Sequence, residues 1–126
     1  MSMKHLNRPN NKVNSKKIGK HYEQIACQFL IEQGLVLLAQ NSQYQLGEID
    51  LVMRDKTCLV FVEVRYRKNA NFGEAEMTIS FNKQTKITHA AQLWMLENNF
   101  NIEDTEFRFD VFAITGKNQQ WIINAF

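Results

Sequence analysis

Two long apolar segments separated by a short polar turn most constrain the fold of this chain. Residues 47–54 and 58–67 are rich in valine, isoleucine and leucine, and Asp55-Lys56 lies between them. β-Branched residues favour strands, so we predict an antiparallel hairpin in which facing residue numbers sum to about 111. Strand alternation then predicts one apolar face, made of Ile49, Leu51, Met53, Val60, Val62 and Val64.

The opposite face of this hairpin is predicted to carry charge. In the expected register Glu48 faces Glu63, Asp50 faces Phe61, and Arg65 follows on the same face. Burying carboxylates costs several kcal/mol unless they are paired or bind a cation, and their mutual repulsion adds to that cost. A magnesium ion would remove both penalties, because Mg²⁺ accepts one or two carboxylates and takes water and phosphate oxygens as its other ligands. The diagonal pair Asp50 and Glu63, about 7–8 Å apart at the backbone, could converge on such an ion.

A solvated polar face is the alternative interpretation of the same pattern. Antiparallel hairpins often leave one face in water, and Arg65 would then be a simple salt-bridge partner. Phe61 argues against this alternative because it shares the acidic face. The predicted helix over 81–98 also needs a surface to cover.

The remaining segments predict a mixed α/β fold. Besides the hairpin we expect helices over 15–33 and 81–98, a loop over 68–79, and strands over 35–39, over 107–114 and around Trp121. Ser15 is the expected N-cap of the first helix and Gly34 its C-terminal stop. The order α-β-β-β-α-β-β is typical of a central sheet flanked by helices. The chain of 126 residues fits one domain.

Charge is distributed unevenly along the chain. The net charge is +2, yet six of the fifteen lysines and arginines precede Glu23, the first acidic residue. Residues 1–20 carry a charge of +6 and residues 21–126 a charge of −4. We interpret residues 1–14 as a flexible basic arm and residues 15–126 as one domain, which is acidic beyond residue 20. The arm would either contact the phosphates of a polyanion or be a solvated tail. On the first predicted helix, Glu23 lies at the edge of the apolar stripe.

Cysteine content and hydropathy exclude several classes of protein. Cys27 and Cys58 lie among apolar neighbours, and two such residues do not make the disulfide framework of a secreted domain. The N-terminus lacks the apolar core of a secretory signal, and the apolar segments are shorter than the ~20 residues of a membrane span. We expect a cytoplasmic protein that does not associate with membranes.

A set of linked motifs resembles a known family. The chain resembles the YraN family of small bacterial predicted endonucleases, which is similar to archaeal Holliday-junction resolvases and to PD-(D/E)xK nucleases. The resemblance covers about Gly19 to Phe126. The motifs that carry it are Gly19-x-x-x-Glu23-x-x-Ala26, Asn41, Gly47-Glu48-Ile49-Asp50-Leu51-Val52, Val60-Phe61-Val62-Glu63-Val64-Arg65-x-Arg67, Lys83, Arg108-Phe109-Asp110-Val111 and Asn124-Ala125-Phe126.

The resemblance implies a restriction-endonuclease-like core and a metal-dependent DNA endonuclease. Asp50 and Glu63 would be ligands of Mg²⁺ or Mn²⁺, and Glu23 an accessory carboxylate that acts directly or through water. The substrate would be DNA, with branched or damaged DNA as candidates. Glu48 is a further candidate to assist catalysis. Relatives of the resolvase type are dimers, which implies a homodimer.

Arg65 is a departure from the family pattern, which usually has a lysine at this position. An arginine does not lose its proton and so cannot act as a general base, although it can stabilise a charged transition state. Lys83 and Gln84 on the second helix are the candidate substitutes. Two other functions remain open: a catalytically impaired nucleic-acid-binding module with this fold, and a domain whose acidic face binds a basic protein.

Basic side chains around the carboxylates would bind the DNA backbone. The candidates are Arg67, Lys68, Lys83 and Lys86. We find no motif that reads bases, so recognition is expected to depend on DNA shape rather than on sequence. The chain shows no motif for a small-molecule cofactor.

Overall fold

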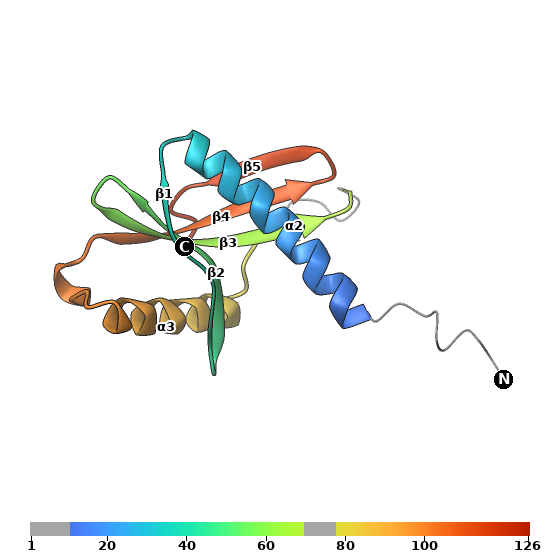
Figure 1. The fold of residues 1–126 in the computed structure, drawn as a ribbon. Coiled ribbons are helices and arrows are strands. Elements are labelled where there is room, and N and C mark those ends of the chain that lie inside the picture. Colours follow the sequence, from blue (N-terminus) through green and yellow to red (C-terminus); the bar gives the residue numbers. More distant parts are fainter. Residues whose placement is uncertain (1–10, 70–77) are drawn as a thin grey trace.

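A five-stranded mixed sheet forms the centre of the computed structural model, which describes residues 11–69 and 78–126, without the side chains of residues 11–15 (Figure 1). The strands, in their order across the sheet, are β1 (Val36–Tyr44), β2 (Gly47–Asp55), β3 (Cys58–Arg67), β4 (Phe107–Thr115) and β5 (Asn118–Ile122). Strands β3 and β4 are parallel, and the other neighbouring pairs are antiparallel. The helices are α2 (Asn11–Glu32), α3 (Phe81–Glu97) and the short 3₁₀ helix η2 (Ile102–Asp104).

This arrangement confirms the predicted α/β class and the order α-β-β-β-α-β-β, and it is consistent with a restriction-endonuclease-like core. The parallel β3–β4 pair requires a crossover, which α3 supplies. Within the described ranges, neither helix is both long enough and apolar enough to cross a bilayer.

Helix α2 begins earlier than the sequence indicated. It starts at Asn11, so Ser15, the expected N-cap, lies inside the helix and residues 11–14 are helical. Residues 11–18 contain neither glycine nor proline, so nothing local stops the helix at Ser15. The rest of the expected arm, residues 1–10, lies outside the described residues.

The C-terminus of α2 is the predicted one. Gly34 has a φ of 100°, a backbone conformation that glycine adopts without steric penalty. The Gly34 N–H donates to Ile31 O at 2.9 Å and the Leu35 N–H to Leu30 O at 3.1 Å. These bonds satisfy carbonyl groups that the end of a helix would otherwise leave unpaired.

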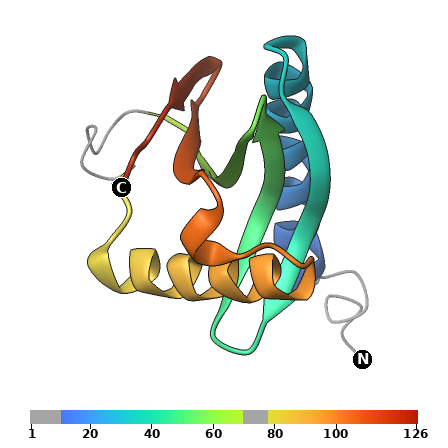
Figure 2. The ribbon, with the colours of Figure 1, turned by 90° about the vertical axis from the view of Figure 1, so that its left-hand side faces the viewer.

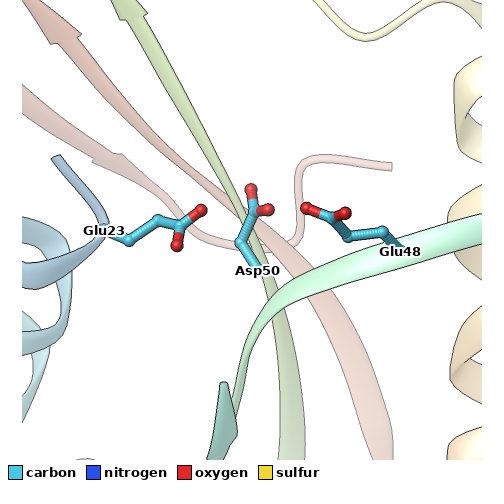
Figure 3. Close-up of side chains that lie close together, drawn as sticks. All are labelled: Glu23, Glu48 and Asp50. Carbon is cyan, nitrogen blue, oxygen red and sulfur yellow. The ribbon is translucent and has the colours of Figure 1, made fainter. Parts of the chain in front are cut away.

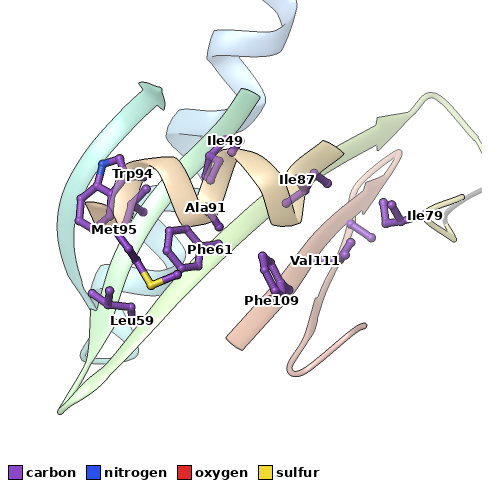
Figure 4. Close-up of a cluster of buried hydrophobic side chains, with 13 residues drawn as sticks. Ile49, Leu59, Phe61, Ile79, Ile87, Ala91, Trp94, Met95, Phe109 and Val111 are labelled. Atoms are coloured by element: carbon purple, nitrogen blue, oxygen red, sulfur yellow. The ribbon is translucent and has the colours of Figure 1, made fainter. Parts of the chain in front are cut away.

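The two helices cover opposite faces of the sheet (Figures 1 and 2). On one face, Ala26 and Leu30 of α2 pack in a buried cluster with Leu51, Val60 and Phe112. On the other, α3 packs in a second buried cluster (Figure 4), which includes Leu59, Phe61, Ile87, Ala91, Trp94, Met95 and Val111. A fully buried side chain of this size stabilises the fold by about 1.5–3 kcal/mol.

The register of the β2–β3 hairpin differs from the prediction. Leu51 pairs with Val62, Val52 with Phe61 and Asp55 with Cys58. Asp55 closes the ladder as a paired residue, so the turn consists of Lys56-Thr57 rather than Asp55-Lys56. Lys56 adopts a left-handed φ of 57°. This displacement of the turn shifts the pairing by two residues, so Asp50 does not face Phe61 and Glu48 does not face Glu63.

The predicted division of the hairpin into two faces is also partly wrong. Leu51 and Met53 lie in the α2 cluster with Val60 and Val62, as expected. Ile49, however, belongs to the α3 cluster together with Val52. Ile49 and Val52 are three residues apart in the strand, so they can share a face only where the alternation of side chains is interrupted. The interruption lies between Ile49 and Leu51, directly beyond the last pair of the β2–β3 ladder, Leu51 and Val62.

Strand β1 is longer than the expected strand over 35–39. It extends to Tyr44 because its polar second half pairs with β2, as in Ser42 with Ile49 and Gln43 with Glu48. Polar composition hid this edge strand, which main-chain pairing rather than burial holds in place.

Gly47 brings the start of β2 into backbone contact with α3. A Cβ atom built at Gly47 would lie 2.5 Å from the Lys86 carbonyl oxygen, closer than such atoms can approach. The absence of a side chain at Gly47 is therefore what allows the strand to approach the helix.

A buried carboxylate fixes the C-terminal part of the chain. Asp110 is fully buried, and its Oδ1 accepts hydrogen bonds from Arg108 Nε at 3.0 Å and from the Asn124 backbone N–H at 2.9 Å. Its Oδ2 accepts one from Trp121 Nε1 at 2.9 Å. Arg108 also pairs with Asp55 at 3.2 Å. This network joins β4 to β5, to the chain after β5 and to the end of β2.

We expect Asp110→Ala to lower the free energy of unfolding by about 3–5 kcal/mol, because the half-buried Arg108 would keep only Asp55 as a partner, and the donors of Trp121 and Asn124 would lose their acceptor. Urea unfolding monitored by tryptophan fluorescence measures the change. Glu103→Gln, at an exposed position of η2, is the control and should unfold like the wild type. Equal midpoints for Asp110→Ala and wild type would contradict this role.

Candidate metal centre

Three carboxylates from two elements meet where β2 separates from β3 (Figure 3). Glu23 comes from α2, and Glu48 and Asp50 come from the first half of β2. One oxygen from each lies within 4.8 Å of the others. Figure 3 shows Asp50 between the other two side chains. The three residues line an open cleft of about 360 Å³ together with Glu63 and Lys83.

Asp50 lies where β2 separates from β3. Its Oδ2 accepts a hydrogen bond from the Val64 backbone N–H at 2.8 Å, immediately beyond the last ladder pair of Leu51 and Val62. The side chain thus takes a donor of β3 that the ladder no longer pairs. Only 8% of the surface of Asp50 is exposed, so this bond fixes the carboxylate at the wall of the cleft.

Glu23 has a buried oxygen without a partner. Its Oε1 is inaccessible to solvent and accepts no hydrogen bond from any described residue. A hydrogen bond from Asn41 reaches the Glu23 side chain and favours its charged form. Because a buried and unpaired carboxylate oxygen is costly, Glu23 is suited to bind a cation or to hold a proton.

Burial and mutual repulsion raise the pKa values of the carboxyl groups in the cleft. The pKa of Asp50 is raised to about 6, mainly by burial, with a contribution from the charge of Glu48, while the Val64 N–H opposes the shift. Burial and the charge of Asp50 raise the pKa of Glu23 to about 7. The same two causes raise the pKa of Glu63 to about 8, and the positive charges of Lys83 and Arg65 oppose that shift.

These carboxylates fit the ligand preference of a hard divalent cation. Mg²⁺ and Mn²⁺ bind oxygen donors, and a cluster of negative groups that repel one another is relieved when a cation binds. The unpartnered Oε1 of Glu23 and the convergence of Glu23, Glu48 and Asp50 both fit such an ion. Glu63 lines the same cleft but does not belong to the closest group of three.

Of the basic residues singled out from the sequence, Lys83 lies on the cleft. It lines the cleft from α3, and its charge lowers the pKa of both Asp50 and Glu63. Arg65 is half-buried on β3 and lowers the pKa of Glu63. Arg65 is not among the residues that line the cleft.

Gln84 and Arg67 lie apart from the carboxylates. Gln84 donates a hydrogen bond to Ile79 O at 2.9 Å, and with Arg67 it lines a separate cavity of about 580 Å³ beside β4 and β5. Lys68 and Lys86 are exposed.

Two contributors to the site were not assigned a role from the sequence. Asn41 bonds Glu23 and has a left-handed φ of 51° in the middle of β1, a conformation that asparagine tolerates better than most residues. The Val64 N–H that fixes Asp50 is a backbone group. An asparagine within a polar strand was the one available signal, and the role of a backbone donor depends on the register.

Residues 22–114 match the model of the family described as "Uncharacterised protein family UPF0102". The chain belongs to this family. It is 49% identical over 115 residues to a UPF0102 protein of Vibrio cholerae, covering 90% of this chain and 94% of that relative. A UPF0102 protein of Yersinia enterocolitica is 49% identical over 108 residues, which cover 86% of this chain and 92% of the relative.

A UPF0102 protein of Pectobacterium carotovorum is 44% identical over 114 residues, which cover 90% of this chain and 97% of the relative. UPF0102 is the YraN family, so these matches confirm the resemblance seen in the sequence. The range matched by the UPF0102 model contains all four carboxylates of the cleft, which are Glu23, Glu48, Asp50 and Glu63.

We expect the metal-free protein to lose stability as the pH rises from about 4 to about 8. Raised pKa values of Asp50, Glu23 and Glu63 mean that the folded state binds more protons than the unfolded state, whose carboxyl groups titrate near 4. The stabilisation is complete below that value and is lost as the pH passes through the folded pKa values. Thermal melts in EDTA should show a melting temperature lower by roughly 5–10 °C at pH 8 than at pH 5.

The double variant Asp50→Asn, Glu63→Gln removes two of these titrations and serves as the comparison. Its melting temperature should change less between pH 5 and pH 8 than that of the wild type. Glu32→Gln, an exposed substitution on α2, should keep the wild-type slope. A double variant with the full pH dependence would show that other groups dominate it.

Proposed function

We propose that this protein is a metal-dependent endonuclease that hydrolyses phosphodiester bonds in DNA, with branched or damaged DNA as the candidate substrate. The observation that carries the proposal is the meeting of Glu23, Glu48 and Asp50 in a cleft that also contains Glu63 and a lysine. Acidic oxygens beside a cation are the groups expected to hold a divalent ion against a phosphate.

Asp50 and Glu63, with Glu23 and Glu48 beside them, would hold Mg²⁺ or Mn²⁺. When bound, the ion would lower the pKa of an attacking water and polarise the scissile phosphate. The hydrogen bond from Val64 to Asp50 leaves the other oxygen of that carboxylate available to the cleft. Asn41 holds Glu23 by one hydrogen bond and thereby limits the orientations of this accessory carboxylate.

Arg65 occupies the position of the family's usual lysine, and Lys83 is the side chain best placed to take over the role of that lysine. It lines the carboxylate cleft, whereas the described lining does not include Arg65. As a positive charge beside the acids, Lys83 would stabilise the negative charge that develops on the phosphate. Arg65 would keep a supporting role through its charge on Glu63.

The DNA backbone would be bound by basic side chains near the cleft. Lys68 and Lys86 are exposed and suited to phosphate contacts, and Arg67 and Lys83 would add to them. Such contacts position a duplex but carry no sequence information. A cytoplasmic location and a homodimer belong to the same proposal.

We expect Asp50→Ala to reduce nicking at least about 100-fold, because it removes the central carboxylate. Nicking of supercoiled plasmid and cleavage of linear, nicked and four-way DNA in Mg²⁺ and in Mn²⁺ measure the effect. Glu32→Gln on the exposed surface of α2 is the control. Equal activity of Asp50→Ala and wild type would refute the assignment of the site.

DNA binding without cleavage by the wild-type protein in both metals would favour the alternative, a catalytically impaired binding module in which Arg65 replaces the usual lysine. Mn²⁺ binding by calorimetry separates the two further. The nuclease requires a site that Asp50→Asn weakens, while a binding module does not.

We expect Lys83→Met to lower kcat about 100-fold with a small change in DNA affinity, because its charge acts in the cleft. Lys86→Met is the matched control, since Lys86 is one turn away on α3 and exposed. That variant should weaken DNA binding and leave kcat unchanged. Identical effects of the two substitutions would mean that Lys83 is a phosphate contact alone.

A further inference from the structure

A pair of stacked tyrosines borders the carboxylate cleft. Tyr22 of α2 and Tyr66 of β3 lie with ring centroids 3.7 Å apart and ring planes inclined by 13°. Both rings line the cleft that contains Glu23, Asp50 and Glu63. Tyr22 directly precedes Glu23, and Tyr66 follows Glu63 by three residues, so the stack is fixed to the same two elements as the acids.

The fold buries this stack incompletely. Tyr22 packs against the margin of the α2 cluster, but Tyr66 exposes 39% of its surface. Ile18, one helical turn before Tyr22, lines the same cleft and is 51% exposed. An aromatic surface is thus partly exposed to solvent beside a strongly polar site.

Positive charge lies on both sides of the stack and the acids. Lys16, Lys17 and Lys20 of α2 are exposed, and Lys20 is near enough to lower the pKa of Glu23. Lys83 lines the cleft from α3. The surface therefore combines a flat aromatic element with lysines, which is the combination that binds unpaired nucleotides through base stacking and phosphate contacts.

We propose that the exposed part of the Tyr22–Tyr66 stack receives an unpaired base next to the phosphate that a cation at the carboxylates would bind. The substrate class would then be DNA with unpaired nucleotides at the cleavage position, such as a flap or a gap, rather than continuous duplex. This inference rests on the proposed function. In a duplex both faces of each base are covered by its neighbours, so a protein ring can stack on a base only after that base leaves the helix.

Stacking of a base on an aromatic ring is worth about 1–3 kcal/mol per base. We therefore expect the wild-type protein to bind a flap or a gapped duplex roughly 5- to 150-fold more tightly than matched duplex. Affinity is measured in Ca²⁺, with 2-aminopurine as the unpaired base, so that binding is read without cleavage. Stacking on the tyrosine should also quench the fluorescence of 2-aminopurine.

Three variants separate stacking from a structural role of the ring. Tyr66→Leu should lose both the preference for unpaired DNA and the quenching, whereas Tyr66→Phe keeps the ring and should retain both. Phe81→Leu is the matched control, because Phe81 is 82% exposed at the start of α3 and lines a different depression. Phe81→Leu should bind like the wild type.

Equal wild-type affinity for flap and duplex would overturn the inference, and so would a Tyr66→Leu variant that keeps the preference. A variant that is less stable but equally selective would show that the stack only fastens α2 to β3. If Tyr66→Leu does not fold, the quenching measured with wild type and Tyr66→Phe decides, and its absence overturns the inference.

The experiments distinguish a failure of the stacking site from a failure of the proposed nuclease activity. Nicking that depends on Asp50 but is equal on flap and duplex would leave the nuclease and remove the stacking site. A flap preference that depends on Tyr66, without any nicking, would leave the stacking site and remove the nuclease.

Discussion

The candidate site depends on the hydrogen bond that the Val64 N–H donates to Asp50. There β2 stops pairing with β3, and a carboxylate side chain takes over a donor of the ladder at 2.8 Å. The separation of the two strands opens the cleft, and the same bond holds Asp50 at its wall. Helix α2 closes one side with Glu23, and Glu48 follows from β2. One side chain thus ends the strand pairing and provides the centre of the acidic group.

The site is also a source of electrostatic strain. Burial together with mutual repulsion raises the pKa values of Asp50, Glu23 and Glu63, whereas the fully buried Asp110 is surrounded by donors from Arg108, Trp121 and Asn124. The fold can therefore satisfy a buried carboxylate completely where it serves stability. The carboxylates of the cleft, in contrast, have too few hydrogen-bond donors and cations among the described residues near them, and perturbed pKa values of this kind are common at functional sites.

Local sequence patterns predicted most of the architecture. Apolar periodicity identified both helices and the hairpin, and Gly34 marked the end of α2 because one residue determines that backbone conformation. The predicted hairpin register was wrong for a local reason, because a turn at Lys56-Thr57 instead of Asp55-Lys56 shifts every pair of the hairpin. Strict alternation did not predict that Ile49 packs on the α3 face; this departure occurs next to the end of the β2–β3 ladder, which a local pattern does not locate. The prediction that α2 starts after Ser15 was wrong. Serine is a good N-cap, but no residue directly before Ser15 stops a helix, and α2 begins at Asn11.

The sequence pattern and the family resemblance point to Glu23, Glu48 and Asp50, but neither shows that the three carboxylates lie together. Their convergence depends on how α2 crosses the sheet, and the place of Lys83 on how α3 does, which are matters of tertiary packing.

The contact of Gly47 with the Lys86 carbonyl has a mechanical consequence. Glu48 follows Gly47 directly, and Lys83 lies one turn before Lys86 on α3. The close approach of Gly47 to the Lys86 carbonyl, which leaves no room for a Cβ atom, therefore sets the spacing between Glu48 and Lys83. Sliding of α3 along the sheet would carry Lys83 and displace the root of β2 together. The width of the cleft between Glu48 and Lys83 therefore depends on the position of α3 on the sheet.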